Sequence, residues 1–254
     1  YHMYKKIIIY ELNEVPYKIL DWFCKVYPQS AFNEIKNKSD LYETYATDEG
    51  HLSPWITWPT VHRGVNNQLH EISDFGVNLT KLNKDFPPIW EILQKNNVKI
   101  GLFGSLHSYP IPQNIDNISF YVPDTFAAGS ECFPKDLESF QDFNLKMVSS
   151  NARNVNSKIL IKEGINFIKN SYSLGIRTKT LIDTGKQIIS ELTDKNRLVR
   201  RRTLQMKLAF DIFYKNLKNC NPDCSFFFTN HVASSMHRYW PCLFIDDYKD
   251  NNFD

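Results

Sequence analysis

The stretch His51-Leu-Ser-Pro-Trp-Ile-Thr57-Trp-Pro59-Thr-Val-His-Arg-Gly64 places a hydroxyl residue two positions before a proline, where a helix is predicted to begin. Proline is favoured in the first turn of a helix because its missing N–H costs nothing there. We therefore expect Thr57 at the helix N-terminus, where free N–H groups and the positive dipole end attract an anion. Given a cation, such a hydroxyl can attack phosphorus or sulfur. The alternative is that Thr57 only caps the helix.

Two predicted strands flank this helix. Residues Ile7–Glu14 predict a short buried strand that ends in polar, ligand-capable side chains. Residues 87–93 predict an amphipathic helix that opens at a proline pair, and residues 98–104 predict a second strand. In open α/β sheets, binding sites lie beyond the carboxyl ends of the strands, so Glu11 and Asn13 become candidate site residues.

The order of these segments resembles the alkaline phosphatase superfamily, most closely its type I phosphodiesterase/nucleotide pyrophosphatase branch. The resemblance is carried by Thr57-Trp58-Pro59, Leu69-His70-Glu71-Ile72, Pro88-Ile89-Trp90, Ile100-Gly101-Leu102-Phe103-Gly104 and His107-Ser-Tyr-Pro110. It implies an α/β fold with a mostly parallel sheet flanked by helices. It also implies metal-assisted hydrolysis or transfer of a phosphate ester through a Thr57 nucleophile. The substrate would be a small phosphorylated molecule or a glycan-type compound.

A second block of motif residues lies near the C-terminus. Residues 222–231 predict a loop, a buried strand over Phe226–Phe228 and polar residues at its end, His231 among them. In the resembled family a strand at this place ends in Asp-x-x-x-His, and both residues bind a metal. His237 matches that histidine, whereas Ala233 stands where the aspartate is expected.

The resemblance implies a divalent metal, Zn, Mn or Mg, held by Glu11, Asn13 and His237 with His231 nearby. Asn13 stands where the first strand of the family carries an aspartate. An amide oxygen supplies only a dipole to a cation and an alanine supplies nothing, so these departures weaken the site. They favour a competing hypothesis, a catalytically inactive relative that binds a phosphorylated ligand or a partner protein.

The 254 residues can bury a large core and hold one domain, or one domain with a lid. A formal charge of +2 gives no strong attraction to nucleic acid or membranes, and no apolar run approaches the roughly 20 residues that span a bilayer. The odd number of scattered cysteines predicts a reducing compartment, and we expect a cytoplasmic protein. Cys220 and Cys224 with His231 and His237 form a weaker alternative, a structural zinc site.

Residues 127–219 are predicted to form a helical cap between a first α/β part, residues 4–126, and a return to the core at residues 220–254. Helical periodicity is clearest over residues 159–168, 180–189 and 194–218. The last of these segments carries a basic cluster at Arg197, Arg200, Arg201, Arg202 and Lys207. Such clusters are usually solvated helix faces.

The functional alternative is an anion clamp, in which Arg200 and Arg201 hold the substrate from the cap. Nucleic-acid binding is a weaker hypothesis, since no recognised motif accompanies the cluster. His107 follows the second predicted strand and is a candidate substrate contact. The family carries a further Asp-His-Gly-like segment and a last metal-binding histidine, which these residues do not contain. The oligomeric state is not predicted.

Overall fold

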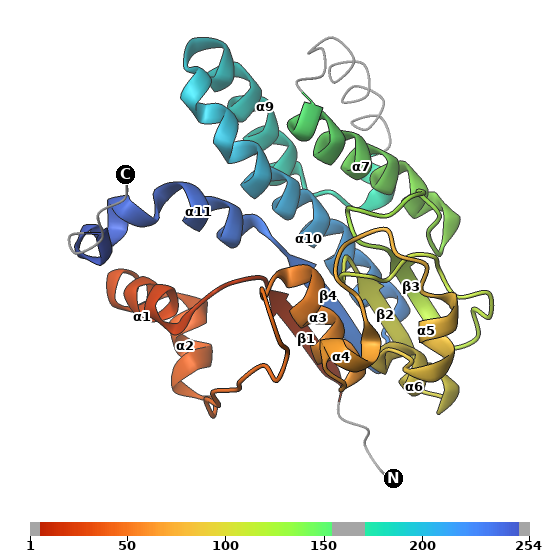
Figure 1. The fold of residues 1–254 in the computed structure, drawn as a ribbon. Coiled ribbons are helices and arrows are strands. Elements are labelled where there is room, and N and C mark those ends of the chain that lie inside the picture. The colour runs from red at the N-terminus through yellow and green to blue at the C-terminus, as the bar shows by residue number, and fades with distance from the viewer. Residues whose placement is uncertain (1–5, 154–170, 249–254) are drawn as a thin grey trace.

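The computed structural model describes residues 6–153 and 171–248, and it contains one four-stranded parallel sheet (Figure 1). The strands are β1 (Ile7–Leu12), β2 (Ile100–Phe103), β3 (Ile118–Val122) and β4 (Cys224–Thr229), in the order β1-β4-β2-β3. Every neighbouring pair of strands is parallel. The expected α/β class with a parallel sheet flanked by helices is therefore confirmed.

The helices fall into two groups along the chain. Between β1 and β2 lie α1 (Tyr17–Val26), α2 (Ala31–Asn37), α3 (Pro54–Arg63), α4 (Asn67–His70), α5 (Thr80–Asp85) and α6 (Ile89–Lys95). After β3 lie η1 (Lys135–Leu137), α7 (Glu138–Arg153), α9 (Thr178–Thr193), η2 (Lys195–Arg200), α10 (Arg201–Cys220), α11 (His231–Leu243) and η3 (Ile245–Tyr248).

The two faces of the sheet are covered by different helices. Phe226 and Phe227 are successive residues of β4, so their side chains point to opposite faces. Phe226 packs against Trp90 of α6, while Phe227 packs against Phe213 of α10, with ring centroids 5.8 and 4.7 Å apart. Full burial of each phenylalanine stabilises the fold by roughly 1.5–3 kcal/mol. The sheet is thus a middle layer between α3 and α6 on one face and α7 and α10 on the other.

The predicted cap is helical where the structure describes it, but it also supplies part of the core. Leu208, Ile212 and Phe213 of α10 lie in one buried cluster with Phe103 and Phe227 of the strands. The N-terminal half of α10 continues beyond the carboxyl ends of the strands (Figure 1). The segment 159–168, predicted as a helix, lies outside the described residues.

The strand predicted within residues 7–14 is present as β1, but the prediction that it is buried is wrong. β1 is an edge strand, and Ile7 and Ile8 are 55% and 57% exposed. Only its end is covered, where Glu11 is buried beneath α3. The order of strands is set by distant pairing, with β4 inserted between β1 and β2, and the composition of residues 7–14 does not contain that information.

The prediction that the nucleophile helix begins at Pro59 is also wrong. Helix α3 begins at Pro54 with Ser53 as the N-cap residue, and Pro59 lies inside it. Thr57 is consequently the fourth helical residue, and its Oγ1 donates to the carbonyl of Ser53 at 3.1 Å. Both prolines satisfied the rule for a first turn, and the chain uses the earlier one.

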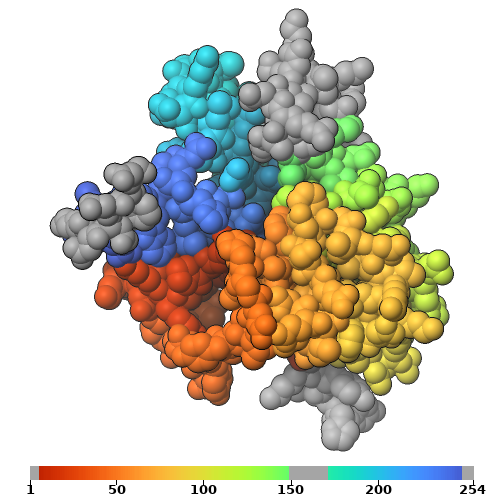
Figure 2. Space-filling view, viewed as in Figure 1, coloured from red at the N-terminus to blue at the C-terminus, as the bar shows by residue number. Residues whose placement is uncertain are grey.

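Helices α1 and α11 lie side by side at one end of the molecule. In the space-filling view the atoms of α11 rest directly on those of the N-terminal helices (Figure 2). A search of the described helices for a segment long and apolar enough to cross a membrane found none.

Candidate functional site

Asparagine side chains follow β1 and β4 at the carboxyl edge of the sheet. Asn13 Nδ2 donates to Asn230 Oδ1 at 2.7 Å, and Trp58 Nε1 of α3 donates to Asn13 Oδ1 at 2.8 Å. Asn13 is 4% exposed, so both ends of its amide are used in a buried position. The residue predicted as a metal ligand therefore ties β1, β4 and α3 together.

Glu11 lies one residue before the end of β1 and is equally well satisfied. Its Oε1 is 2.8 Å from His62 Nε2, and its Oε2 accepts from Ser105 Oγ at 2.7 Å. All three residues are buried. His62 Nδ1 is buried and has no hydrogen-bond partner among the described residues. Each carboxylate oxygen of Glu11 thus already has a protein partner.

The histidines predicted to complete the metal site have other partners. His237 Nε2 lies 2.7 Å from Glu14 Oε2, and the His237 side chain is largely exposed. His231 Nδ1 lies 2.6 Å from Thr229 Oγ1. Within residues 6–153 and 171–248, no three His, Cys, Asp or Glu side chains are grouped closely enough to hold a metal. This arrangement does not fit the implied metal or the alternative zinc site at Cys220 and Cys224.

A cavity of about 330 Å³ opens beyond the carboxyl ends of β2, β3 and β4, and we call it the edge cavity. Its floor comes from strand ends and its roof from α7, α10 and the first turn of α11. The residues that line it are Phe103, Gly104, Pro123, Thr125, Phe126, Asn144, Val148, Arg202, Gln205, Met206, Ala209, Phe227, Phe228, Thr229, Asn230, His231 and Ser234. This is the edge at which open parallel sheets bind ligands.

Arg202 supplies the positive charge of the edge cavity. It lies at the exposed mouth, and its guanidinium makes no hydrogen bond or ion pair with any part of the chain that the structure describes. Gln205 lies one turn further along α10 and is hydrogen-bonded to Asn144 of α7. A guanidinium held without a carboxylate partner is free to bind an anion.

The two arginines predicted as the anion clamp do not line this cavity. Arg201 Nη2 pairs with Glu191 Oε2 of α9 at 2.7 Å, and Arg200 lines a separate groove between α9 and α10. Arg200 and Arg201 therefore cannot serve as a clamp for the edge cavity in this arrangement. The missed signal is a helical stripe, because Arg202, Gln205, Met206 and Ala209 recur at three and four positions along α10.

His107 lies in the loop that follows β2, close to Trp55 of α3. Its Nε2 lies 3.1 Å from the Trp55 carbonyl oxygen, and burial lowers the pKa of His107 to about 4. Asp124 follows β3 and shares a second cavity of about 230 Å³ with His107. Burial raises the pKa of Asp124 to about 6, although its carboxylate accepts bonds from the Ser108 and Phe126 N–H groups.

Thr57 is half-buried and belongs to neither cavity. The hydroxyl at the N-terminus of α3 is that of Ser53, which makes no capping bond with the helix. This N-terminus faces the carboxyl edge, because Trp55 contacts His107 and Trp58 contacts Asn13. The anion-attracting position described for Thr57 is thus occupied by Ser53.

Comparisons of this chain with protein-family models, with curated proteins and with solved structures found no match. The site residues must therefore carry any functional conclusion.

Proposed function

We propose that this chain binds a small anionic ligand of the phosphate-ester class in the edge cavity. The observation that carries the proposal is the guanidinium of Arg202, which has no partner in the described part of the chain, at a cavity beyond the carboxyl ends of three neighbouring parallel strands. An arginine fork matches the geometry of a phosphoryl group and binds it through two parallel hydrogen bonds.

The other polar groups of the cavity suit the same ligand. Asn230 and Ser234 offer an amide and a hydroxyl, and His231 offers an imidazole ring. Burial lowers the pKa of His231 and so favours the neutral ring. The anion would then be held by one charge and several neutral donors. A volume of about 330 Å³ is in the range of small-ligand sites.

Binding without turnover is favoured by the state of the residues predicted to be catalytic. Glu11 and Asn13 have all side-chain polar atoms bonded to other residues, and Thr57 is bonded within its own helix. A catalytic or metal-binding role would require these bonds to be exchanged. We also propose that the α/β fold is of the alkaline phosphatase type, as the sequence resemblance implies. The position of the α3 N-terminus at the carboxyl edge of the sheet supports this proposal.

A second candidate is hydrolysis or transfer of a phosphate ester, and the hydroxyl of Ser53, which makes no capping bond, favours it. The hydroxyl lies at the N-terminus of a ten-residue helix that points toward the carboxyl edge. The sequence predicts Thr57 as the nucleophile and Zn, Mn or Mg as the metal, but in this candidate Ser53 takes the role of Thr57. Activity of the purified chain on aryl phosphate mono- and diesters, with each metal added, tests this candidate.

Calorimetric titration with phenyl phosphate tests the proposed binding. We expect Arg202→Gln to weaken binding at least tenfold, because a charge-assisted bidentate contact is lost. Arg200→Gln is the matched control. It removes the same charge two residues before Arg202, from a side chain that lies outside the edge cavity. Equal affinities of the two variants would refute the proposal.

A further inference from the structure

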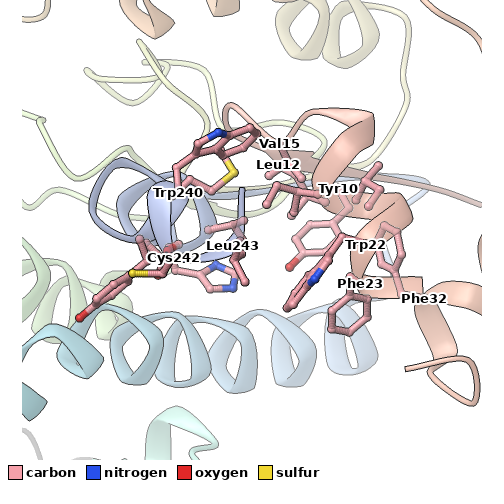
Figure 3. Close-up of a pocket in the computed structure, with 16 residues that line it drawn as sticks. Tyr10, Leu12, Val15, Trp22, Phe23, Phe32, Trp240, Cys242 and Leu243 are labelled. Atoms are coloured by element: carbon pink, nitrogen blue, oxygen red, sulfur yellow. Dashed lines mark hydrogen bonds between the residues drawn. The ribbon is translucent and has the colours of Figure 1, made fainter. Parts of the chain in front are cut away.

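An apolar groove runs between α1 and α2 on one side and α11 on the other, with the end of β1 between them; we call it the α1–α11 groove. Its volume is about 590 Å³. In Figure 3 the side chains of Trp22, Phe23 and Phe32 face those of Trp240, Cys242 and Leu243 across it. The rest of the lining is mostly apolar and includes Tyr10, His231, Ser235, Met236 and Tyr239.

The residues that line the groove indicate which class of ligand it can bind. It contains no aspartate, glutamate, lysine or arginine, and its surface is formed by aromatic rings, aliphatic side chains and one methionine. The polar residues of the lining include Tyr10, Tyr239, Ser235 and His231. Sugars and charged peptides need more polar partners than these, or charged ones, whereas a hydrocarbon chain needs none.

His231 lies between the α1–α11 groove and the edge cavity, because this residue lines both. It is the first residue of α11, and its neighbours divide between the two sites: Ser234 lines the cavity and Ser235 lines the groove. Its Nδ1 is bonded to Thr229, and its Nε2 has no partner among the residues that the structure describes. A polar site with a cation and an apolar site therefore adjoin at one imidazole.

We infer that the ligand is an amphiphile, a phosphate ester of a long apolar chain, with its phosphate beside Arg202 and His231 and its chain in the α1–α11 groove. The inference rests on the proposed function and names its ligand class. The charge of Arg202 matches the head, the uncharged aromatic lining matches the tail, and the shared lining residue His231 makes the two sites neighbours.

A series of alkyl phosphates with one, four, eight and twelve carbons tests the inference. The titrations are made below the critical micelle concentration of each compound, with the fluorescence of Trp22 and Trp240 as a second signal. We expect the affinity to rise about threefold to fourfold for each buried methylene, until the groove is filled. An affinity that does not depend on chain length would overturn the inference.

Two variants test whether the alkyl chain of the ligand lies in the groove. Leu243→Arg places a charge in the groove, at a position that is 41% exposed, and it should abolish the dependence on chain length while inorganic phosphate still binds. Leu192→Arg on α9 is the control, because Leu192 is 84% exposed and lies outside both sites. Circular dichroism confirms that both variants fold. An unchanged chain-length dependence in Leu243→Arg contradicts the placement of the chain.

The failure of the inference is distinguishable from the failure of the proposed function. If inorganic phosphate and methyl phosphate bind in an Arg202-dependent way but longer chains add nothing, only the inference is wrong. If no alkyl phosphate responds to Arg202→Gln, the proposed function itself is wrong. If dodecanol binds as tightly as dodecyl phosphate, the groove holds apolar chains independently and the link between head and tail is refuted.

Discussion

His107 Nε2 bonds the carbonyl of Trp55 in the first turn of α3, which the helix itself cannot satisfy. In a regular helix the N–H of residue 59 would bond this oxygen, but residue 59 is Pro59 and has no N–H. The imidazole at 3.1 Å takes its place. Because a carbonyl only accepts, Nε2 carries the proton. The loop after β2 is thereby fastened to the first turn of α3, at the edge where the cavities lie.

His107→Phe should destabilise the protein by about 1–3 kcal/mol, because the Trp55 carbonyl loses its partner. Pro59→Ala supplies an N–H that can bond the same oxygen, so the cost of His107→Phe should be smaller in the Pro59→Ala background. Urea unfolding of the two single variants and the double variant measures the difference. Strictly additive free energies would show that the two residues do not share this carbonyl.

His107 and Asp124 should have opposite effects on the stability of the native state as the pH falls. The pKa of His107 is lowered to about 4, so its contribution to stability is complete above pH 6.5 and is lost as the pH falls toward 4. The pKa of Asp124 is raised to about 6, so the native state gains stability as the pH falls from 6 toward 4. Each effect amounts to at most about 3 kcal/mol.

Variants that remove one titrating group at a time separate the contribution of His107 from that of Asp124. Between pH 6.5 and pH 4 Asp124→Asn should lose more stability than the wild type, and His107→Phe should lose less. Unfolding by urea across this range gives the slopes, and titrating groups elsewhere contribute alike to all three proteins. Identical slopes would mean that neither group titrates as its burial requires.

Glu11 is expected to matter for stability. Glu11→Ala leaves His62 Nε2 and Ser105 Oγ without partners in the interior, which costs about 2–5 kcal/mol. Glu14→Ala is the control, since its partner His237 is exposed and such pairs contribute at most about 1 kcal/mol. If Glu11→Ala instead stabilised the protein in urea unfolding, its carboxylate would be held there for a ligand.

Activity assays on Thr57→Ala and Ser53→Ala decide between the two hydroxyls. If the chain hydrolyses aryl phosphates, Ser53→Ala should remove the activity, and Thr57→Ala should change it by less than about threefold, since Thr57 lies within the helix. The assays are run with Zn, Mn and Mg added separately. The opposite pattern would restore Thr57 as the nucleophile and with it the family mechanism.

The local features of this fold were readable from sequence, and the distant ones were not. The strand at Phe226–Phe228, the helix near Trp90 and the polar residues at strand ends follow from periodicity and composition. The insertion of β4 between β1 and β2 does not, and it is what leaves Ile7 and Ile8 exposed. Long-range pairing, which no local pattern encodes, decided which strand became the edge.

The errors in the site have a similar origin. The start of α3 was misplaced by five residues because Pro54 and Pro59 carry the same signal. The basic residues of α10 are evident in the sequence, but the direction of each side chain depends on its position around the helix. Arg201 pairs with Glu191 and is therefore not available to a ligand in the edge cavity. Asp124 is not a predicted site residue because no strand is predicted at residues 118–122, and the sequence therefore gives no reason to expect Asp124 at the carboxyl edge.

The most direct measurement of the proposed function is a crystal structure of the chain grown with phenyl phosphate. We expect the phosphoryl oxygens to lie within hydrogen-bonding distance of the Arg202 guanidinium, with Asn230 or His231 as a further contact. Phosphate bound instead in the groove of Arg200, or at the α3 N-terminus without Arg202, would contradict the edge cavity as the binding site.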